Sequence, residues 1–383
     1  MGKVRRKPPP ACLKHYGFPL FCASWVESHN ILTLKEGERE EEDKQQKKTR
    51  RYLIFGGGGG PGRTGVRNGL VLAHHDFDTD VLSEAVHFYD TDDDPPYRMA
   101  IHPLDDSIIC SFLNDCRRFE LTSQDESEAK KIGIKPSEKA LDQLENVGQQ
   151  QSLVFSTDGL LLAAGGVDGH LRVFEWPSLK IVLDQPDAHK SIKDMDFSLD
   201  GNFLASLGDS GPCRIWNLST STPVASLSVD TGERFGSCRF SRDGVRPLLF
   251  ITVKQGEKGL IAYWDTNTWE KVGAQVIEKN PICAFNISSD GKFLATGTSE
   301  GDISIIKVSK MRPCQKVKGA HMFFVSSMEF SRDSRALVSA SGDSSLKVTR
   351  IEEQRHEAGN LLFKIFMIFL AVWLFYLVKN RGF

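Results

Sequence analysis

The stretch FSTDGLLLAAGGVDGHLRVFEW, from Phe155 to Trp176, contains the pattern that determines the fold. Its opening phrase, F-S-x-D-G, is followed by an apolar run, a second Asp-Gly turn and a run in which apolar and polar residues alternate. Alternation with a period of two residues, bounded by Asp-Gly turns, is the signature of antiparallel strands joined by hairpins. The stretch therefore predicts a small antiparallel sheet.

The same unit recurs through the second half of the chain. Its opening phrase returns at Phe197 and Phe240 and, in weaker form, at Ile287 and Phe330, with spacings of 42, 43, 47 and 43 residues. A period of this length is typical of β-propeller blades, each made of four short strands. The repeat thus predicts five consecutive blades.

Two earlier segments complete the ring. Tyr97–Leu121 has the same outline, with HPLDD in place of F-S-x-D-G, and a further blade combines Leu20–Val26, Tyr52–Phe55 and Leu70–Asp76. The predicted fold class is all-β: a seven-bladed WD-type propeller over residues 19–353. Closure of the ring removes free sheet edges, and we expect residues before Leu20 to supply the outer strand of the last blade.

Two polar insertions and one acidic stretch interrupt this pattern. Residues 35–51 are a mixed-charge run, expected to be a solvated excursion between the first two strands. Residues 122–151 lack aromatic side chains and are predicted to be a long loop with a helix beginning at Pro136. Asp76–Asp94 has eight acidic and no basic side chains, which indicates either an exposed acidic edge or a docking surface for a basic partner.

Composition places the propeller in the cytosol. The chain has 383 residues, a net charge of −2 and 40% hydrophobic residues, which gives no overall bias toward nucleic acid. Eight scattered cysteines form no C-x-x-C pair, so no zinc or thioredoxin-like motif is predicted, and reduced thiols are expected. The basic segment 1–18 leads into prolines and has no apolar core, so it does not resemble a signal peptide.

The C-terminal end of the chain is strongly apolar. Residues 361–378, LLFKIFMIFLAVWLFYLV, carry one charge, at Lys364, and at ~1.5 Å per residue a helix of this length covers ~27 Å, close to the thickness of a thin bilayer. We predict a single transmembrane helix here, with a buried core helix as the alternative. Residues 354–360 are then a juxtamembrane linker and residues 379–383 a short luminal tail.

A glycine-rich loop lies in the first blade. Phe55–Asn68 reads FGGGGGPGRTGVRN, and five consecutive glycines predict irregular backbone, neither helix nor strand. Three interpretations are open: a phosphate cradle, a flexible hairpin tip, or a rigid loop used on a partner. For the first, Gly57–Thr64 reads G-x-x-x-x-G-R-T, but Arg63 replaces the required Lys and strand-like residues follow where a P-loop needs a helix.

Several polar residues match the internal packing of a propeller, and we do not assign them to catalysis. His189, Ser206, Asp209 and Trp216 are placed where a WD-repeat blade has a hydrogen-bonded tetrad. His321 and Asp343 repeat part of it, with Thr349 in the position of the Trp. Two glycosylation sequons, at Asn217 and Asn286, fall in or beside predicted strands and are interpreted as chance matches.

A cytosolic seven-bladed propeller, a first-blade loop of the form G-G-G-G…G-x-x-N and a C-terminal anchor together resemble the endoplasmic reticulum (ER) exchange-factor family of the COPII coat, which includes the prolactin regulatory element-binding protein. The resemblance implies a guanine-nucleotide exchange factor for a Sar-type small GTPase in ER–Golgi protein transport. Such a factor makes no bonds and is not a hydrolytic enzyme. It also implies an ER membrane protein with a luminal C-terminus, and no nucleic-acid partner is expected.

The resemblance also assigns roles within the loop. Main-chain carbonyls of Gly56, Gly57, Gly58, Gly59, Gly60 and Gly65 would bind a potassium ion, and Asn68 would be the polar tip that contacts the GTPase. Arg67 departs from the family, which commonly has Pro at this position, and Arg leaves φ free where Pro would fix it. The phosphate transporter traffic facilitators are a similar branch that assists ER exit of a membrane cargo without exchange activity. That accessory role is the alternative, and a membrane-tethered scaffold with an idle loop is a third hypothesis.

Overall fold

The computed structural model describes residues 10, 12–26, 50–62, 64–105, 107–126 and 129–352, together with Met367 and Leu370. The chain divides into two compact units, residues 1–350 and 351–383. Apart from those two positions, the predicted transmembrane segment 361–378 lies outside the described residues, as does the insertion 35–49. Within the described part, no helix is long and apolar enough to cross a membrane.

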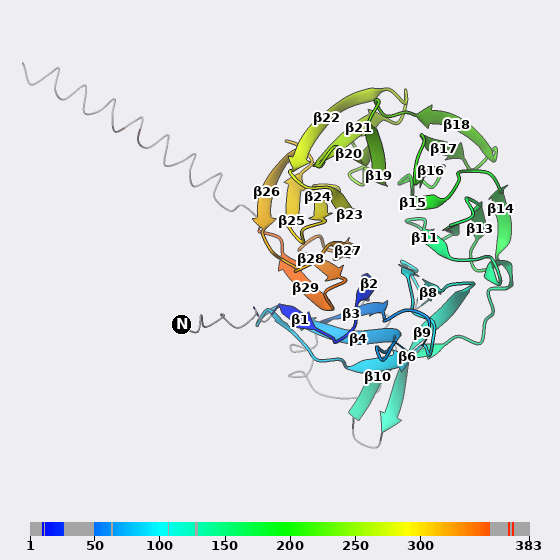
Figure 1. The fold of residues 1–383 in the computed structure, drawn as a ribbon, viewed down its shortest axis with the longest axis vertical. Helices are drawn as coiled ribbons and strands as arrows, with labels where there is room; N and C mark the ends of the chain where they lie inside the picture. Colours follow the sequence, from blue (N-terminus) through cyan, green and yellow to red (C-terminus); the bar gives the residue numbers. More distant parts are fainter. Residues whose placement is uncertain are drawn as a thin grey trace, which may run out of the picture. The chain divides into compact units, whose positions relative to one another are not determined.

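The described part of residues 1–350 forms seven antiparallel sheets that follow one another around a ring (Figure 1), so the predicted seven-bladed, all-β propeller is confirmed. The strands of the first three blades are β2 (Leu20–Val26), β3 (Arg50–Gly57), β4 (Gly69–Asp76), β5 (Val81–Leu82) and β6 (His87–Asp90); β7 (Arg98–Ile101), β8 (Ile108–Ser111), β9 (Cys116–Glu126) and β10 (Ala129–Pro136); β11 (Gln150–Phe155), β12 (Leu161–Gly166), β13 (Leu171–Glu175) and β14 (Lys180–Gln185).

The remaining four blades have the same order. Their strands are β15 (Ile192–Phe197), β16 (Phe203–Gly208), β17 (Cys213–Asn217) and β18 (Thr222–Leu227); β19 (Glu233–Phe240), β20 (Leu248–Gln255), β21 (Lys258–Asp265) and β22 (Lys271–Glu278); β23 (Ile282–Ile287), β24 (Phe293–Thr298), β25 (Ile303–Lys307) and β26 (Arg312–Val317); β27 (Val325–Phe330), β28 (Ala336–Ser341), β29 (Ser345–Arg350) and β1 (Leu13–His15).

The F-S-x-D-G phrase forms the turn between the first two strands of a blade. The hydroxyl of Ser156 donates to the carboxylate of Asp158 and accepts the amide of Leu161, over 3.0 Å. Gly159 has φ of 75°, a conformation that suits glycine. The Ser–Asp bond repeats at Ser198, Ser288 and Ser331, which explains why the phrase marks the blades.

The hydrophobic core consists of clusters packed between neighbouring blades. The cluster that joins the first and last blades contains Leu53, Phe55 and Val71 from one side and Val338 and Val348 from the other, all at most 1% exposed. Fully burying side chains of this size contributes ~1.5–3 kcal/mol each. The glycine-rich loop therefore begins directly after one of the most buried residues of the fold, Phe55.

The chain end before Leu20 closes the ring, as predicted. Strand β1 pairs with β29, with Leu13 opposite Lys347 and His15 opposite Ser345, and it completes the fourth strand of the last blade (Figure 1). The amide of Val348 also donates to the carbonyl oxygen of Cys12 over 2.9 Å.

The prediction of a long loop over residues 122–151 is wrong for the first half of this segment. Strands β9 and β10 continue past the second blade as a hairpin (Figure 1). Their pairing runs from Phe119 opposite Pro136 to Glu126 opposite Ala129. Ile132 and Ile134 alternate with polar or small residues and are buried in the core, a period-two pattern that is typical of a strand. The prediction of a helix beginning at Pro136 is also wrong, because the structure has a single 3-10 turn, Asp142–Leu144, in this region.

Strand direction gives the ring two distinct faces. One face, here the turn face, carries the F-S-x-D-G turns, and neighbouring turns contact each other, as between His102 Nε2 and the Gly159 carbonyl at 2.9 Å. The other, here the loop face, carries the connections between the second and third strands of each blade and those between blades. The glycine-rich loop joins β3 to β4 and therefore lies on the loop face.

Candidate functional site: the glycine-rich loop

The first two glycines of the loop belong to the sheet, so the prediction that the whole run is irregular is wrong for them. Gly56 and Gly57 end β3 and pair with Leu70 and Gly69 of β4 on one side and with β2 on the other. Glycine is required here because of close packing. A Cβ on Gly57 would lie 2.1 Å from the carbonyl oxygen of Pro19.

The next glycines shape the loop itself. A Cβ on Gly58 would lie 2.0 Å from Oδ1 of Asn68, and one on Gly59 would lie 2.3 Å from Oγ1 of Thr64. Gly60 and Gly65 face open space, but their φ angles of 93° and 77° belong to the region that favours glycine. Close packing therefore explains the glycines near the sheet, and backbone conformation explains those farther out.

Asn68 closes the loop at its base. Its side chain is 3% exposed; Nδ2 donates to the carbonyl oxygens of Gly60, over 3.2 Å, and Asp92, over 2.9 Å, while Oδ1 accepts the amide of Gly60 at 3.3 Å. The expectation that Asn68 is the polar tip of the loop is therefore wrong. The sequence placed it at the end of the glycine run but carried no sign that its amide turns inward.

Arg67, by contrast, is exposed on the loop face. Its guanidinium lies 4.1 Å from the centre of the Phe88 ring and forms an ion pair with Asp90 at 3.1 Å, and its side chain is 67% exposed. Both partners come from β6, the outer part of the same blade. Exposed contacts of these kinds each contribute on the order of 0–1 kcal/mol, so they orient Arg67 without holding it firmly.

The outer part of the loop, residues 61–67, is the segment that the structure presents to solvent. Among its described residues Pro61, Gly62, Thr64, Gly65, Val66 and Arg67 are all exposed. Strand β4 follows, whereas a P-loop requires a helix with its N-terminus toward the phosphates, so the phosphate-cradle interpretation is wrong. A clamped base with an exposed outer segment fits a loop that contacts a partner.

The acidic stretch Asp76–Asp94 is largely engaged within the propeller. Asp90 pairs with Arg67, Asp94 with Arg117, Asp80 with Arg350 and Glu84 with Lys14. Asp76 accepts main-chain amides of the turn that follows β4. These contacts favour an ordinary charged edge over a docking surface for a basic partner.

In the described part of the loop, the oxygen atoms available to a cation belong to main-chain carbonyls and side-chain amides, and no cluster of carboxylates is present. Within the described residues no group of three or more His, Cys, Asp or Glu side chains is placed to hold a metal ion. Gly56 and Gly57 lie within the sheet ladder, which leaves the carbonyls of Gly58, Gly59, Gly60 and Gly65 outside it. Oxygen atoms of this type suit hard cations.

The histidines singled out in the sequence are structural. His189 Nε2 and Trp216 Nε1 each lie 2.8 Å from Oγ of Ser206, but Asp209 is exposed and outside this network, so the predicted tetrad has three members. His321 contacts Ser345 at 2.6 Å and Ser339 at 2.8 Å, and burial lowers its pKa to about 4.

Five of the cysteines are buried and structural, namely Cys22, Cys110, Cys116, Cys213 and Cys238. All eight lie in the described part of the chain and all are free, which agrees with the expected reduced thiols. Burial raises the pKa of the Cys22 thiol to about 12, so this group is neutral at physiological pH and a poor nucleophile.

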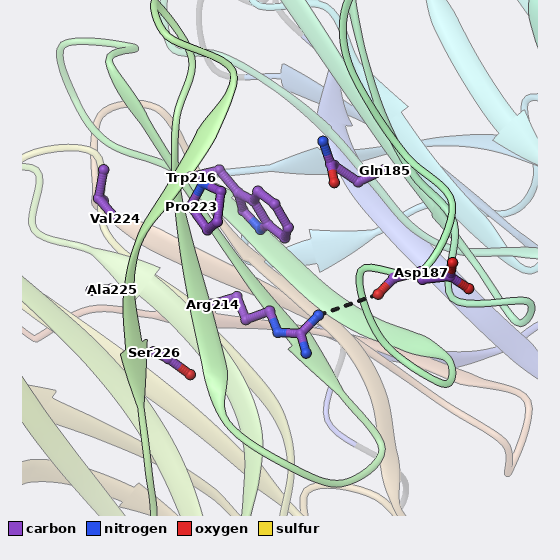
Figure 2. A pocket seen from close by; sticks show the side chains of 8 residues that line it. All are labelled: Gln185, Asp187, Arg214, Trp216, Pro223, Val224, Ala225 and Ser226. Atoms are coloured by element: carbon purple, nitrogen blue, oxygen red, sulfur yellow. Dashed lines mark hydrogen bonds between the residues drawn. The ribbon is translucent and has the colours of Figure 1, made fainter.

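A pocket of about 530 Å³ lies between the outer strands of the third and fourth blades (Figure 2). Trp216 and Pro223 line it, and the guanidinium of Arg214 donates to the carbonyl oxygen of Asp187 at its edge, over 3.3 Å. Arg214 also donates to the carbonyl oxygen of Ala188. The pocket belongs to different blades from the glycine-rich loop, and none of the sequence-predicted site residues lines it.

The fold and the loop define a class of protein: a seven-bladed WD-type propeller whose first blade presents a clamped glycine-rich loop. The WD domain, G-beta repeat family matches residues 147–175, 181–217 and 312–349. SEC12-like protein 2 of Arabidopsis thaliana is 43% identical over 362 residues, covering 91% of this chain and 90% of that protein. The chain belongs to the SEC12-like family of WD-repeat proteins.

Two further relatives bear on function. SEC12-like protein 1 of Arabidopsis thaliana is 36% identical over 299 residues, which covers 76% of this chain and 74% of that protein. The guanine nucleotide-exchange factor SEC12 of Mus musculus is 27% identical over 317 residues, which covers 70% of this chain and 75% of that protein.

Proposed function

We propose that this protein is a guanine-nucleotide exchange factor for a Sar-type small GTPase at the ER membrane, where it starts COPII vesicle budding. The observation that carries the proposal is the construction of the glycine-rich loop, in which a buried Asn68 clamp holds an exposed segment, residues 61–67, on one face of a rigid propeller. Similarity to the mouse exchange factor supports the same conclusion.

The proposed mechanism is binding without bond chemistry. A GTPase holds its nucleotide through the phosphates and Mg²⁺. A factor that binds the nucleotide-free form more tightly than the loaded form weakens nucleotide binding by the same coupling free energy. The exposed segment 61–67 would enter the nucleotide site, and Asn68 would act as a positioning residue that fixes the direction of that segment.

A potassium ion is part of the proposal. The carbonyl oxygens of Gly58, Gly59, Gly60 and Gly65 would hold it, and the ion would supply stiffness that consecutive glycines lack. Asn68 contributes to the same order through its bonds to Gly60 and Asp92. The clamp and the ion would therefore act on the same short segment.

Localisation rests on the apolar segment 361–378, which we propose as a single C-terminal transmembrane helix with the propeller on the cytosolic side. A glycosylation acceptor appended after Phe383 should be modified in ER microsomes, while Asn217 and Asn286 stay unmodified. Asn217 Oδ1 accepts amides of the turn that follows it, and Asn286 lies in β23. Glycans on Asn217 or Asn286 would contradict the cytosolic placement.

An accessory role in ER exit of a membrane cargo, without exchange activity, is the second candidate. The name of the relative with 43% identity favours it, since that protein is called SEC12-like and not exchange factor. Arg67 is a further argument, because the family resemblance implies Pro at this position. The same propeller would serve either role, because fold alone does not determine function.

Nucleotide release separates the candidates. The full chain in detergent micelles is mixed with a Sar-type GTPase loaded with fluorescent GDP, and release is followed with and without excess GTP. We expect release to be accelerated in proportion to the concentration of the protein at low concentrations and to saturate at high ones. Release at the intrinsic rate of the GTPase at every concentration would exclude the exchange role.

A further inference from the structure

Three consecutive apolar side chains project from the loop face, and the proposed mechanism does not use them. Met322 is 77% exposed, Phe323 57% and Phe324 47%. They lie in the connection from β26 to β27, between the sixth and seventh blades. We refer to these three residues as the apolar triplet. Adjacent exposed apolar residues of this size mark interaction sites more often than isolated ones do.

The backbone holds the apolar triplet in place. The amide of Met322 donates to Oδ2 of Asp343 over 2.6 Å, and Oγ of Ser341 donates to the carbonyl oxygen of Phe324 over 2.9 Å. The preceding residue, His321, is 4% exposed and donates its amide to the carbonyl oxygen of Gly301 over 3.1 Å. The exposure of the triplet is thus fixed by the fold, which reduces the ordering cost of binding.

A continuous line of contacts leads from the triplet to the glycine-rich loop. Asp343, which holds Met322, lies in the same turn as Ser344, whose carbonyl oxygen accepts the amide of Tyr16 at 2.9 Å. The chain then runs to Pro19, whose carbonyl oxygen accepts the amide of Gly58 at 3.0 Å. Both features therefore belong to the loop face and are linked through the start of the chain that closes the ring.

We propose that the apolar triplet is a second contact for the same small GTPase, and that it binds an apolar patch beside the nucleotide site. This inference rests on the proposed function. The loop displaces the nucleotide, whereas the triplet supplies affinity, since large apolar side chains that become fully buried dominate interface energies. A protein partner is favoured over the bilayer because the triplet shares the loop face with the exposed segment 61–67, which the proposed function assigns to the GTPase.

The test compares a double variant with a matched control. Met322→Ser/Phe323→Ser removes the two more exposed members and keeps Phe324, whose ring lies close to Gly342. The control, Leu160→Ser/Val245→Ser, removes apolar side chains that are 62% and 80% exposed on the turn face. Unchanged melting temperatures establish that both variants fold.

The primary measurement is the dissociation constant of the full chain for the nucleotide-free GTPase, in detergent and in phospholipid nanodiscs. We expect the double variant to raise it at least tenfold in both, and the control to leave it unchanged. In release assays, the concentration that gives half-maximal acceleration should rise by the same factor at an unchanged maximal rate. A loop variant such as Asn68→Ala should instead lower the maximal rate.

The outcomes separate the two proposals. If the unaltered protein binds the GTPase without accelerating release, the exchange role fails, and the dissociation constants still decide on the triplet. If it does not bind at all, both proposals fail. Equal dissociation constants for the double variant and the unaltered protein would overturn the inference, as would a loss confined to nanodiscs, which would indicate a bilayer contact.

Discussion

The side-chain amide of Asn68 donates to the carbonyl oxygen of Asp92 over 2.9 Å, and this bond ties the end of the glycine-rich loop to the segment between the first and second blades. The same amide group reaches Gly60 on the other side of the loop. One buried side chain therefore connects three separate main-chain segments. The order of the exposed residues 61–67 depends on it.

Asn68→Ala should reduce both stability and exchange. The substitution removes the hydrogen bonds that the Asn68 amide donates to the carbonyls of Gly60 and Asp92 in a part-buried site, and each such bond contributes ~0.5–1.5 kcal/mol to the unfolding free energy. Nucleotide release should fall more than tenfold, since a lost interaction of ~1.4 kcal/mol suffices for that factor. Chemical unfolding and release assays measure the two effects, with Asn267→Ala, at an exposed turn position, as the control. Normal exchange in Asn68→Ala would mean that the loop is not the acting element.

Arg67→Pro tests whether a more restricted backbone before Asn68 increases exchange. Proline fixes φ near −65° and reduces the conformations that the exposed segment must lose on binding. We expect faster release than in the unaltered protein. Arg67→Ala is the matched control, since it removes the contacts with Phe88 and Asp90 without fixing the backbone. If the unaltered protein is inactive and the Arg67→Pro variant is active, the chain belongs with the cargo-exit branch.

Replacing K⁺ with Li⁺ tests the proposed ion. If carbonyls of Gly58, Gly59, Gly60 and Gly65 bind potassium, the smaller ion should fit them poorly, so release should slow and protease cleavage near Gly58 should increase. The measurements are release rates and peptide mapping at constant ionic strength, with Na⁺ and choline as further salts. Equal rates and equal cleavage in all salts would leave the loop ordered by Asn68 alone.

The pH dependence of stability should report on His321. Burial lowers its pKa to about 4, whereas an unfolded histidine titrates near 6.5. Between these values the unfolded chain binds a proton that the folded one does not, so unfolding free energy is retained above pH ~6.5 and falls as the pH drops toward 4. His321→Gln should flatten this slope in part, and His189, whose pKa burial also lowers to about 4, should supply the remainder. Identical slopes for His321→Gln and the unaltered protein would contradict the assignment.

Much of the fold could be predicted because the repeated phrase has a local cause. Ser156, Asp158 and Gly159 satisfy their turn among themselves, so the signal stays within a few residues and recurs with each blade. The closing strand β1 was predictable from the need to remove a free edge. The β9–β10 hairpin was not predicted because charged and polar residues dominate residues 122–136, and Ile132 and Ile134 carry the apolar alternation of β10.

The candidate site was located from sequence but was inaccurate in detail. The glycines indicated a special backbone, yet the partners that explain them, Pro19 and Asn68, are set by strand register and by side-chain direction. The contacts of Arg67 with Phe88 and Asp90 connect β6 to the loop, and no short motif announces them. Sequence spacing identifies a loop more readily than it identifies which of its side chains face inward.

The pairing of β1 with β29 has a consequence for biosynthesis. Cys12 and Lys347, which contact each other in the last blade, are 335 positions apart, so β1 leaves the ribosome long before its partner strand β29 has been made. Domains form from the N-terminal side during synthesis, and exposed strand edges promote aggregation. We therefore expect a nascent chain that ends before β29 to need chaperone protection of its open edges, and C-terminal truncations within the last blade to be cleared by the cell instead of accumulating as shorter rings.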